Sequence, residues 1–134
     1  MANTNTNTRL ILGNSKVVQY LTIASDGTQE TDLVVYSSSA VASALGKTDL
    51  KNSKIRSLQY ISSGAAVVTK LEWDATTDVL ACALSRYDTK MNFDHIGGLK
   101  NTGGAGKTGD ILLTTTGLAA GDSLTLVLVV GPEL

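Results

Sequence analysis

The chain has 134 residues, of which 43% are hydrophobic and 17% are charged, and its 11 basic and 12 acidic residues leave a net charge of −1 at pH 7. This length suits one domain with a sizeable core, and the near-zero charge offers no electrostatic footprint for a nucleic acid backbone. The charged fraction is below the roughly 25% that is usual in soluble domains, which is typical of a surface partly covered by something else.

The first predicted element is an arm over residues 1–8. These residues repeat Asn and Thr and contain no apolar side chain beyond the second residue, so alone they cannot offset the entropy of ordering. We therefore expect a flexible N-terminal arm followed by a single β-sandwich domain over residues 9–134. A second interpretation is that Asn3, Asn5 and Asn7 become ordered against a neighbouring subunit.

The next residues predict strands joined by a tight turn. Residues 9–12 suit a short strand, and residues 16–24 are rich in β-branched and aromatic side chains. Asp26-Gly27 follows, a pair that two-residue hairpin turns favour because both central positions adopt positive φ. Residues 29–36 are expected to return as the partner strand, so we predict a hairpin here.

A short helix is predicted for residues 40–45. Val41, Ala44 and Leu45 share one helical face. The serines before this segment offer an N-cap, and Gly46 stands where a C′ glycine ends many helices.

A second hairpin is predicted farther along the chain. Residues 54–62 and 65–73 have strand patterns and flank the turn pair Ser63-Gly64. Apolar and polar side chains alternate in the second run, and its last residue, the single tryptophan, suits a core anchor. The residues expected to face inward are Val67, Thr69, Leu71 and Trp73.

A turn over residues 74–78 is predicted to lead into a strand over residues 79–85. Asp74 and Asp78 are expected to cap this turn by accepting hydrogen bonds from backbone N–H groups. Residues 87–94 fit neither pattern clearly.

Two strands are predicted after the glycine-rich loop of residues 97–109, over residues 110–116 and 122–130. The second strand carries apolar side chains on both faces, because Val127 and Val129 lie opposite a row of leucines. Apolar surface beyond what a core needs indicates an interface. We therefore expect Val127 and Val129 to contact another protein.

The predicted elements add up to about seven or eight strands and one short helix. Strands at regular spacing with turn signals between them are typical of a sandwich or small barrel. The sequence thus predicts an all-β fold, an antiparallel and jelly-roll-like β-sandwich.

No catalytic, cofactor or metal site is predicted. Residues 103–108 resemble part of a phosphate-binding loop, but Asn101 replaces the first glycine of that motif and a β-branched run follows in place of a helix. Cys82 is the single cysteine, in an apolar setting that predicts a buried core residue. His95 is the single histidine, and the carboxylates near it and in residues 74–78 lack the ligand spacing of a calcium or zinc site. We therefore expect no enzyme activity and no cofactor.

Membrane and sugar-binding features are weak as well. No apolar run approaches the roughly 18 residues of a membrane span, and no signal sequence opens the chain. We expect a protein made in a cytosol, or kept in something assembled there, with no membrane or nucleic acid partner. Aromatic residues make up 4% of the chain, which leaves few platforms for stacking on sugars or bases.

Four stretches carry a resemblance to known proteins: residues 71–77 (LEWDATT), 93–101 (FDHIGGLKN), 106–117 (GKTGDILLTTTG) and 121–123 (GDS). In these stretches the chain resembles small virion proteins of marine tailed bacteriophages, most closely the head decoration, or cement, proteins. The resemblance spans roughly residues 60–130.

This class implies a β-sandwich that clamps subunits of the major capsid protein, often as a trimer, in a virion assembled in the host cytoplasm. The expected partners are the major capsid protein and copies of the chain itself, as a homotrimer. The expected interface residues are Asn3, Asn5, Asn7, Val127 and Val129. Phage tail modules that recognise a receptor or glycan share the same sequence pattern, so this function is the alternative. It predicts an exposed aromatic cluster at one end of the sandwich.

Overall fold

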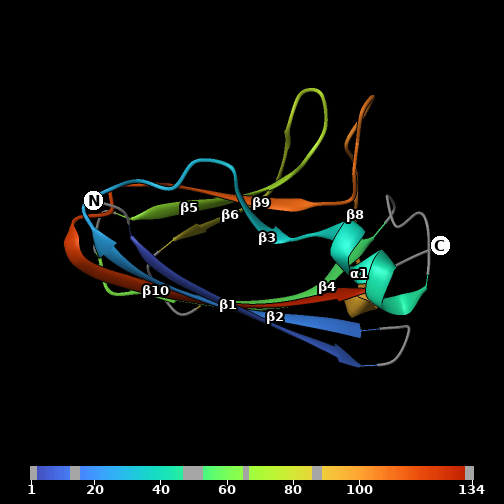
Figure 1. Cartoon of the computed structure of the whole chain (residues 1–134), viewed down its shortest axis with the longest axis horizontal. Coiled ribbons are helices and arrows are strands. Elements are labelled where there is room, and N and C mark those ends of the chain that lie inside the picture. Colours follow the sequence, from blue (N-terminus) through green and yellow to red (C-terminus); the bar gives the residue numbers. More distant parts are fainter. Residues whose placement is uncertain (1–2, 13–15, 47–52, 65–66, 86–88, 132–134) are drawn as a thin grey trace.

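A computed structural model describes residues 3–12, 16–46, 53–64, 67–85 and 89–131, which form two antiparallel sheets packed face to face (Figure 1). The strands of the larger sheet are β1 (Thr4–Leu12), β2 (Lys16–Asp26), β4 (Lys54–Ser62), β7 (Thr89–Asn92), β8 (Leu99–Lys100) and β10 (Ala120–Gly131). Those of the smaller sheet are β3 (Leu33–Tyr36), β5 (Val68–Trp73), β6 (Val79–Ser85) and β9 (Ile111–Thr116).

The strand order is that of a jelly roll. The larger sheet runs β1-β2-β10-β4-β7, with β8 also paired to β4, and the smaller sheet runs β3-β9-β5-β6. Leaving out β1 and β8, each sheet has four strands, and the first strand of the roll, β2, pairs with the last, β10. The predicted all-β sandwich is confirmed. The described part has ten strands, because β7 and β8 form where the sequence pattern indicated no strand.

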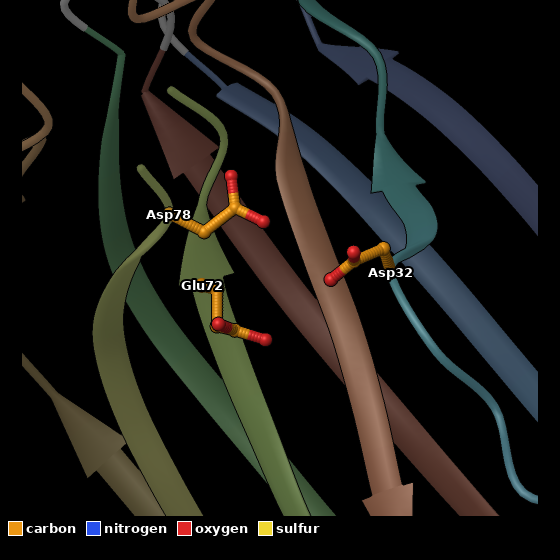
Figure 2. A group of neighbouring side chains, drawn as sticks. All are labelled: Asp32, Glu72 and Asp78. Carbon is orange, nitrogen blue, oxygen red and sulfur yellow. The ribbon is translucent and has the colours of Figure 1, made fainter. Parts of the chain in front are cut away.

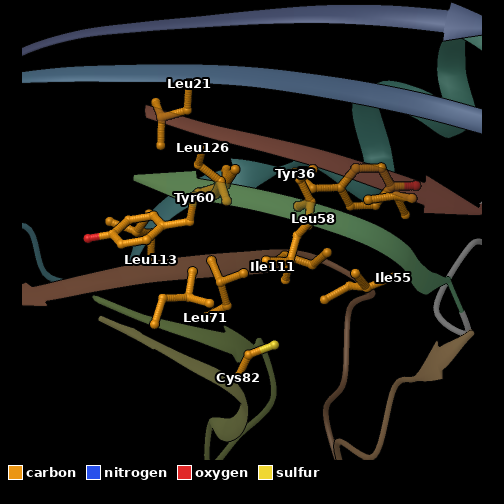
Figure 3. Close-up of a cluster of buried hydrophobic side chains, with 14 of the residues drawn as sticks. Leu21, Tyr36, Ile55, Leu58, Tyr60, Leu71, Cys82, Ile111, Leu113 and Leu126 are labelled. Carbon is orange, nitrogen blue, oxygen red and sulfur yellow. The ribbon is translucent and has the colours of Figure 1, made fainter. Parts of the chain in front are cut away.

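The core lies between the two sheets (Figure 3). Figure 3 shows Leu58 and Leu126 of the larger sheet facing Leu71 and Ile111 of the smaller one. As predicted, the alternating residues of the β5 region face inward, and each of Val67, Thr69, Leu71 and Trp73 is at most 2% exposed.

Polar groups inside this core are paired. The Tyr60 hydroxyl lies 2.6 Å from Thr69 Oγ1, and the Tyr36 hydroxyl lies 3.3 Å from Ser53 Oγ. Cys82 is buried, as predicted, and burial raises the pKa of its thiol. The core therefore holds no reactive thiolate at neutral pH.

The helix α1 (Ser38–Leu45) lies at one end of the sandwich, between β3 and β4 (Figure 1). Its caps are the predicted ones, since Ser37 Oγ accepts a hydrogen bond from the Ala40 N–H at 3.4 Å and Gly46 has a φ of 70°. Val41 is fully buried. The helix begins two residues before the predicted start. Within the described ranges, no helix has the length and apolar content to cross a membrane.

The two predicted hairpins are wrong, because both turns carry the chain from one sheet to the other. Gly27 has the predicted positive φ, 102°, and the Asp26 carboxylate accepts the Thr28 N–H at 3.0 Å. However, β2 pairs with β1 and β10, whereas β3 pairs with β9. Ser63-Gly64 likewise joins β4 to a strand of the opposite sheet. Turn residues define local dihedral angles and do not determine which strand becomes the neighbour.

The predicted flexible arm is wrong for residues 4–8, which form the first half of β1. This strand pairs with β2 in one unbroken antiparallel register, from Thr4 opposite Ala24 to Leu12 opposite Lys16. The Asn-Thr composition predicts disorder for the segment in isolation. The ladder to β2 pairs the backbone N–H and C=O groups on one side of the strand, and these bonds help to offset the entropy of ordering.

The glycine-rich loop packs on the turn of residues 74–78, and Figure 1 shows the two loops rising side by side from the smaller sheet. The Thr76 N–H donates to the Ala105 carbonyl at 3.1 Å. Asp74 accepts from Thr108 Oγ1 at 2.8 Å, in place of the predicted turn-capping bond. Asp78 does cap the turn, by accepting from the Ala75 N–H at 3.2 Å. The loop thus buttresses the β5–β6 hairpin.

Candidate interaction surface

The outer face of the larger sheet is set by the alternation of β10. The side chains of Leu124, Leu126, Leu128 and Val130 face the core and are at most 2% exposed. The intervening residues therefore point away from the core. Among them, Val127 and Val129 are half-buried in the middle of the sheet.

Cross-strand register arranges this face into rows. Val127 lies opposite Tyr20 on β2 and Gln59 on β4. Val129 lies opposite Val18 and Ser57 in the same way. Since facing residues of antiparallel strands share a side of the sheet, each row is a continuous strip of side chains.

Strand β1 extends these rows to the edge of the sheet. Thr8 lies opposite Tyr20, and Leu10 lies opposite Val18. Large apolar side chains stay open to solvent here, because Leu10 is 55% exposed and Tyr20 is 47% exposed. Ile61, on β4, is 51% exposed on the same face. We call this surface the outer face of the larger sheet, made of Thr4, Thr6, Thr8, Leu10, Leu12, Val18, Tyr20, Thr22, Thr125, Val127, Val129, Ser57, Gln59 and Ile61.

The middle of this face carries no charge among the described residues. The charged side chains lie at its margins: Lys16, Lys54, Arg56 and Lys100 at one end, Lys90 at the β7 edge and Asp26 at the other end. Arg56 forms an ion pair with Asp94 at 3.1 Å. A shallow groove of about 430 Å³ lies toward the β7 edge, lined in part by Val127, Val129 and Met91. The surface therefore has an uncharged centre and a mainly basic margin.

The outer face of the smaller sheet differs, because charges stand in its middle. Lys70 and Glu72 alternate with inward-facing residues of β5. Glu72, Asp32 and Asp78 form an acidic cluster, with carboxylate oxygens within 4.8 Å of one another. Figure 2 shows Glu72 and Asp78 on one side of β9 and Asp32 on the other. Only one of the two outer faces is therefore uncharged at its centre.

Hydrogen bonds inside the protein account for the geometry of the acidic cluster. The Thr114 hydroxyl, on β9, donates to Glu72 Oε1 at 3.1 Å and accepts from the Asp32 N–H at 3.1 Å. Asp78 caps its own turn. Carboxylate oxygens suit hard cations such as Ca²⁺, which take six to eight oxygen ligands. One oxygen of each carboxylate accepts a hydrogen bond within the protein, and the three other oxygens make up at most half of that number.

The predicted interface asparagines lie on the opposite side of β1 from Val127 and Val129. Asn3 Nδ2 donates to the Thr28 carbonyl at 2.8 Å, Asn5 Nδ2 to Glu30 at 3.2 Å and Asn7 Nδ2 to the Val35 carbonyl at 2.9 Å. All three amide groups thus bind the segment that leads from β2 through β3. The structure brings Val127 and Val129 together and does not bring the asparagines to the same face.

Sequence reasoning missed the residues that complete the outer face. Thr4, Thr6 and Thr8 were assigned to an arm, and Tyr20 and Ile61 were not connected to β10. The alternation within each strand was visible, but the register between strands was not.

Comparison of the chain with protein-family models and with curated proteins gives no match.

Proposed function

We propose that this protein is a structural virion protein that stabilises a phage capsid by binding the lattice of the major capsid protein through the outer face of its larger sheet. The observation that carries the proposal is the uncharged, partly apolar centre of that face. Val127 lies there between Tyr20 and Gln59, and Val129 lies between Val18 and Ser57. Exposed apolar patches of this kind mark protein interfaces. The resemblance of four stretches to phage head decoration proteins supports the identity of the partner.

The dimensions of the face support a stable contact. Its four long strands β1, β2, β10 and β4 each have at least nine residues. With strands about 4.8 Å apart and a rise of about 3.3 Å per residue, they cover on the order of 600 Å² in projection. Stable protein interfaces bury about 800 Å² per partner. One face of this sheet therefore supplies most of such a contact.

The contrast between the two outer faces supports binding through one side. The charged face of the smaller sheet, with Lys70, Glu72 and Asp32, suits contact with water. A decoration protein needs this division, because one side lies on the shell and the other faces solvent. The resemblance also implies copies of the chain as partners, in a homotrimer.

The alternative function, receptor or glycan recognition in a phage tail, has less support. It predicts a cluster of exposed aromatic side chains for stacking on sugars. Among the described aromatic residues, Trp73, Tyr36 and Tyr60 are at most 1% exposed and Tyr20 alone is largely exposed. The described residues thus offer a single aromatic platform.

Co-sedimentation with purified shells of the particle that contains this chain tests the proposal. The parent protein should pellet with shells stripped of it, and a variant combining Val127→Asp and Val129→Asp should bind at least tenfold more weakly, because two carboxylates would be desolvated at the contact. The matched control combines Val34→Asp and Val68→Asp, exposed positions of the smaller sheet, and should bind like the parent.

Circular dichroism and a thermal melt establish that each variant is folded. Failure of the folded parent to bind shells would overturn the proposal. So would binding of the Val127, Val129 variant at parental strength.

A further inference from the structure

Strand β1 is an open edge of the larger sheet. It pairs with β2 on one side, and no described strand pairs with its other side. All of its nine residues are exposed except Ile11, which is half-buried. An open edge presents a row of backbone N–H and C=O groups that can template pairing with another strand.

The other edge strands of the described part carry features that oppose pairing, whereas β1 has few. β8, which pairs with β4 alone, has two residues. β7 and β3 have four residues each, β7 carries Lys90, and the register of β3 shifts between Val34 and Tyr36. β6 has seven residues, and its register with β5 shifts after Leu71. Short length, lysine and bulges are the usual protections of an edge. β1 has nine residues, no proline, no lysine and no register shift.

The one charged side chain of β1 is held on the inner side of the strand. Arg9 Nε donates to Gln19 Oε1 at 2.9 Å, and Gln19 is 1% exposed. Gln19 Nε2 in turn donates to Asn7 Oδ1 at 2.8 Å. These bonds fix the side of β1 that faces the smaller sheet. The bonds of Asn3 to Thr28 and of Asn7 to Val35 hold the same side. The edge is therefore preorganised, which lowers the entropy cost of pairing.

We propose that β1 pairs antiparallel with β1 of a second copy across a two-fold axis perpendicular to the sheet. Such an axis keeps the two outer faces on the same side, so even-numbered residues meet even-numbered residues in every register. The threonines Thr4, Thr6 and Thr8 then lie opposite threonine or leucine, and cross-strand threonine pairs stabilise antiparallel sheets. With the axis at Thr8, Asn7 lies opposite Arg9 of the second copy, and no like charges meet.

The pairing joins two larger sheets into one continuous sheet. Both outer faces then point the same way, and the uncharged surface doubles. A dimer of this kind binds a repeating lattice at two points, which raises its avidity without new contacts. The pairing of the two β1 strands does not depend on which lattice the protein binds. It gives an assembly of two copies of the chain, whereas the resemblance to decoration proteins implies three.

Disulfide trapping tests the pairing. In a Cys82→Ala background, single cysteines are placed on β1 by Thr6→Cys, Thr8→Cys and Leu10→Cys. Residues directly opposite each other in antiparallel strands have Cα atoms about 4.5–5.5 Å apart, which suits a disulfide. The control is Thr22→Cys, on the same face but one strand inside the edge. A residue lies opposite its own copy only when the axis passes through it, so Thr8→Cys is also mixed with Thr6→Cys and with Leu10→Cys, to cover an axis at Asn7 or Arg9. Mild oxidation should cross-link at least one β1 variant or mixture tenfold faster than Thr22→Cys.

Sedimentation velocity of the parent should show a dimer at micromolar concentration. A strict monomer or a trimer, or faster cross-linking of Thr22→Cys than of every β1 variant, would overturn the pairing. These outcomes are separate from shell binding. A monomer that binds shells would refute the pairing alone, and a dimer that ignores shells would refute the proposed function alone.

Discussion

Asn7 Nδ2 donates a 2.9 Å hydrogen bond to the carbonyl oxygen of Val35, and this bond joins an edge strand of the larger sheet to an edge strand of the smaller one. The Asn7 amide oxygen accepts a second bond from the buried Gln19 side chain at 2.8 Å. One polar side chain thus links both sheets at the open side of the sandwich. It does so from a segment whose composition alone predicts disorder.

Replacing Asn7 should destabilise the fold more than its partial exposure suggests. Asn7→Ala removes the bond to Val35 and leaves the donor of Gln19, which is 1% exposed, without its partner. An unsatisfied buried polar group costs about 1–3 kcal/mol. Urea unfolding measures the loss in free energy of unfolding. Asn5→Ala is the control, since it removes one exposed bond and should cost less; an equal loss in both variants would contradict the role of Gln19.

Trp73→Ala should strongly lower the free energy of unfolding. Trp73 is 1% exposed at the end of β5, and its loss removes transfer free energy and leaves a cavity, which together cost about 3–5 kcal/mol. Val68→Ala, at a 40% exposed position of the same strand, should cost under about 1 kcal/mol. Thermal and urea unfolding compare the two variants. Equal melting temperatures for Trp73→Ala and the parent would show that the inward face of β5 is wrongly assigned.

Gly106 should resist substitution because of its backbone and its surroundings. Its φ is 78°, and a Cβ atom there would overlap the Thr76 side chain on the neighbouring turn. Gly106→Ala should therefore detach the glycine-rich loop from the β5–β6 hairpin and lower stability by about 1–2 kcal/mol. Hydrogen exchange of the Thr76 N–H, which bonds to the Ala105 carbonyl, reports the detachment. Gly104→Ala, where a Cβ meets open space, is the control and should leave that exchange rate unchanged.

Alkaline pH should weaken the fold through two buried groups. Burial raises the pKa of Tyr36 above 10.0, although its bond to Ser53 opposes the shift, and burial raises the pKa of Cys82 above 9.0. Both groups are neutral when folded, so their contribution is complete below about pH 9 and is lost as the pH rises through the raised pKa values. Urea unfolding at pH 8 and pH 10.5 should show the decrease. Combining Tyr36→Phe with Cys82→Ala should flatten it, and an unchanged slope would contradict the assignment.

Local features of the fold were predictable because their causes lie a few residues apart. The caps at Ser37 and Gly46 and the alternation that buries Trp73 depend on near neighbours, and the bounds of β4 matched the predicted strand. The arrangement of strands was not predictable in the same way. A pattern of buried faces does not specify whether the strand after Gly27 pairs with its predecessor or crosses to the other sheet.

The candidate site shows the same division. Val127 and Val129 were found from alternation within one strand. The hydrogen bonds of Asn3, Asn5 and Asn7 could not be predicted in this way, because their partners lie 25 to 28 residues away, at Thr28, Glu30 and Val35. The acidic cluster was missed for the same reason, since Asp32 and Glu72 meet only after the chain has crossed between the sheets.

The pairing of β2 with β10 has a consequence for the time course of folding. Val17, near the start of β2, lies opposite Val130, near the end of β10, so the centre of the larger sheet forms only when both ends of the chain have met. Folds dominated by such distant pairings form in milliseconds to seconds. During synthesis, the edges of β2 and β4 that pair with β10 stay unpaired until β10 has left the ribosome. Chaperones that shield nascent chains should therefore raise the yield of this protein more than they raise its final stability.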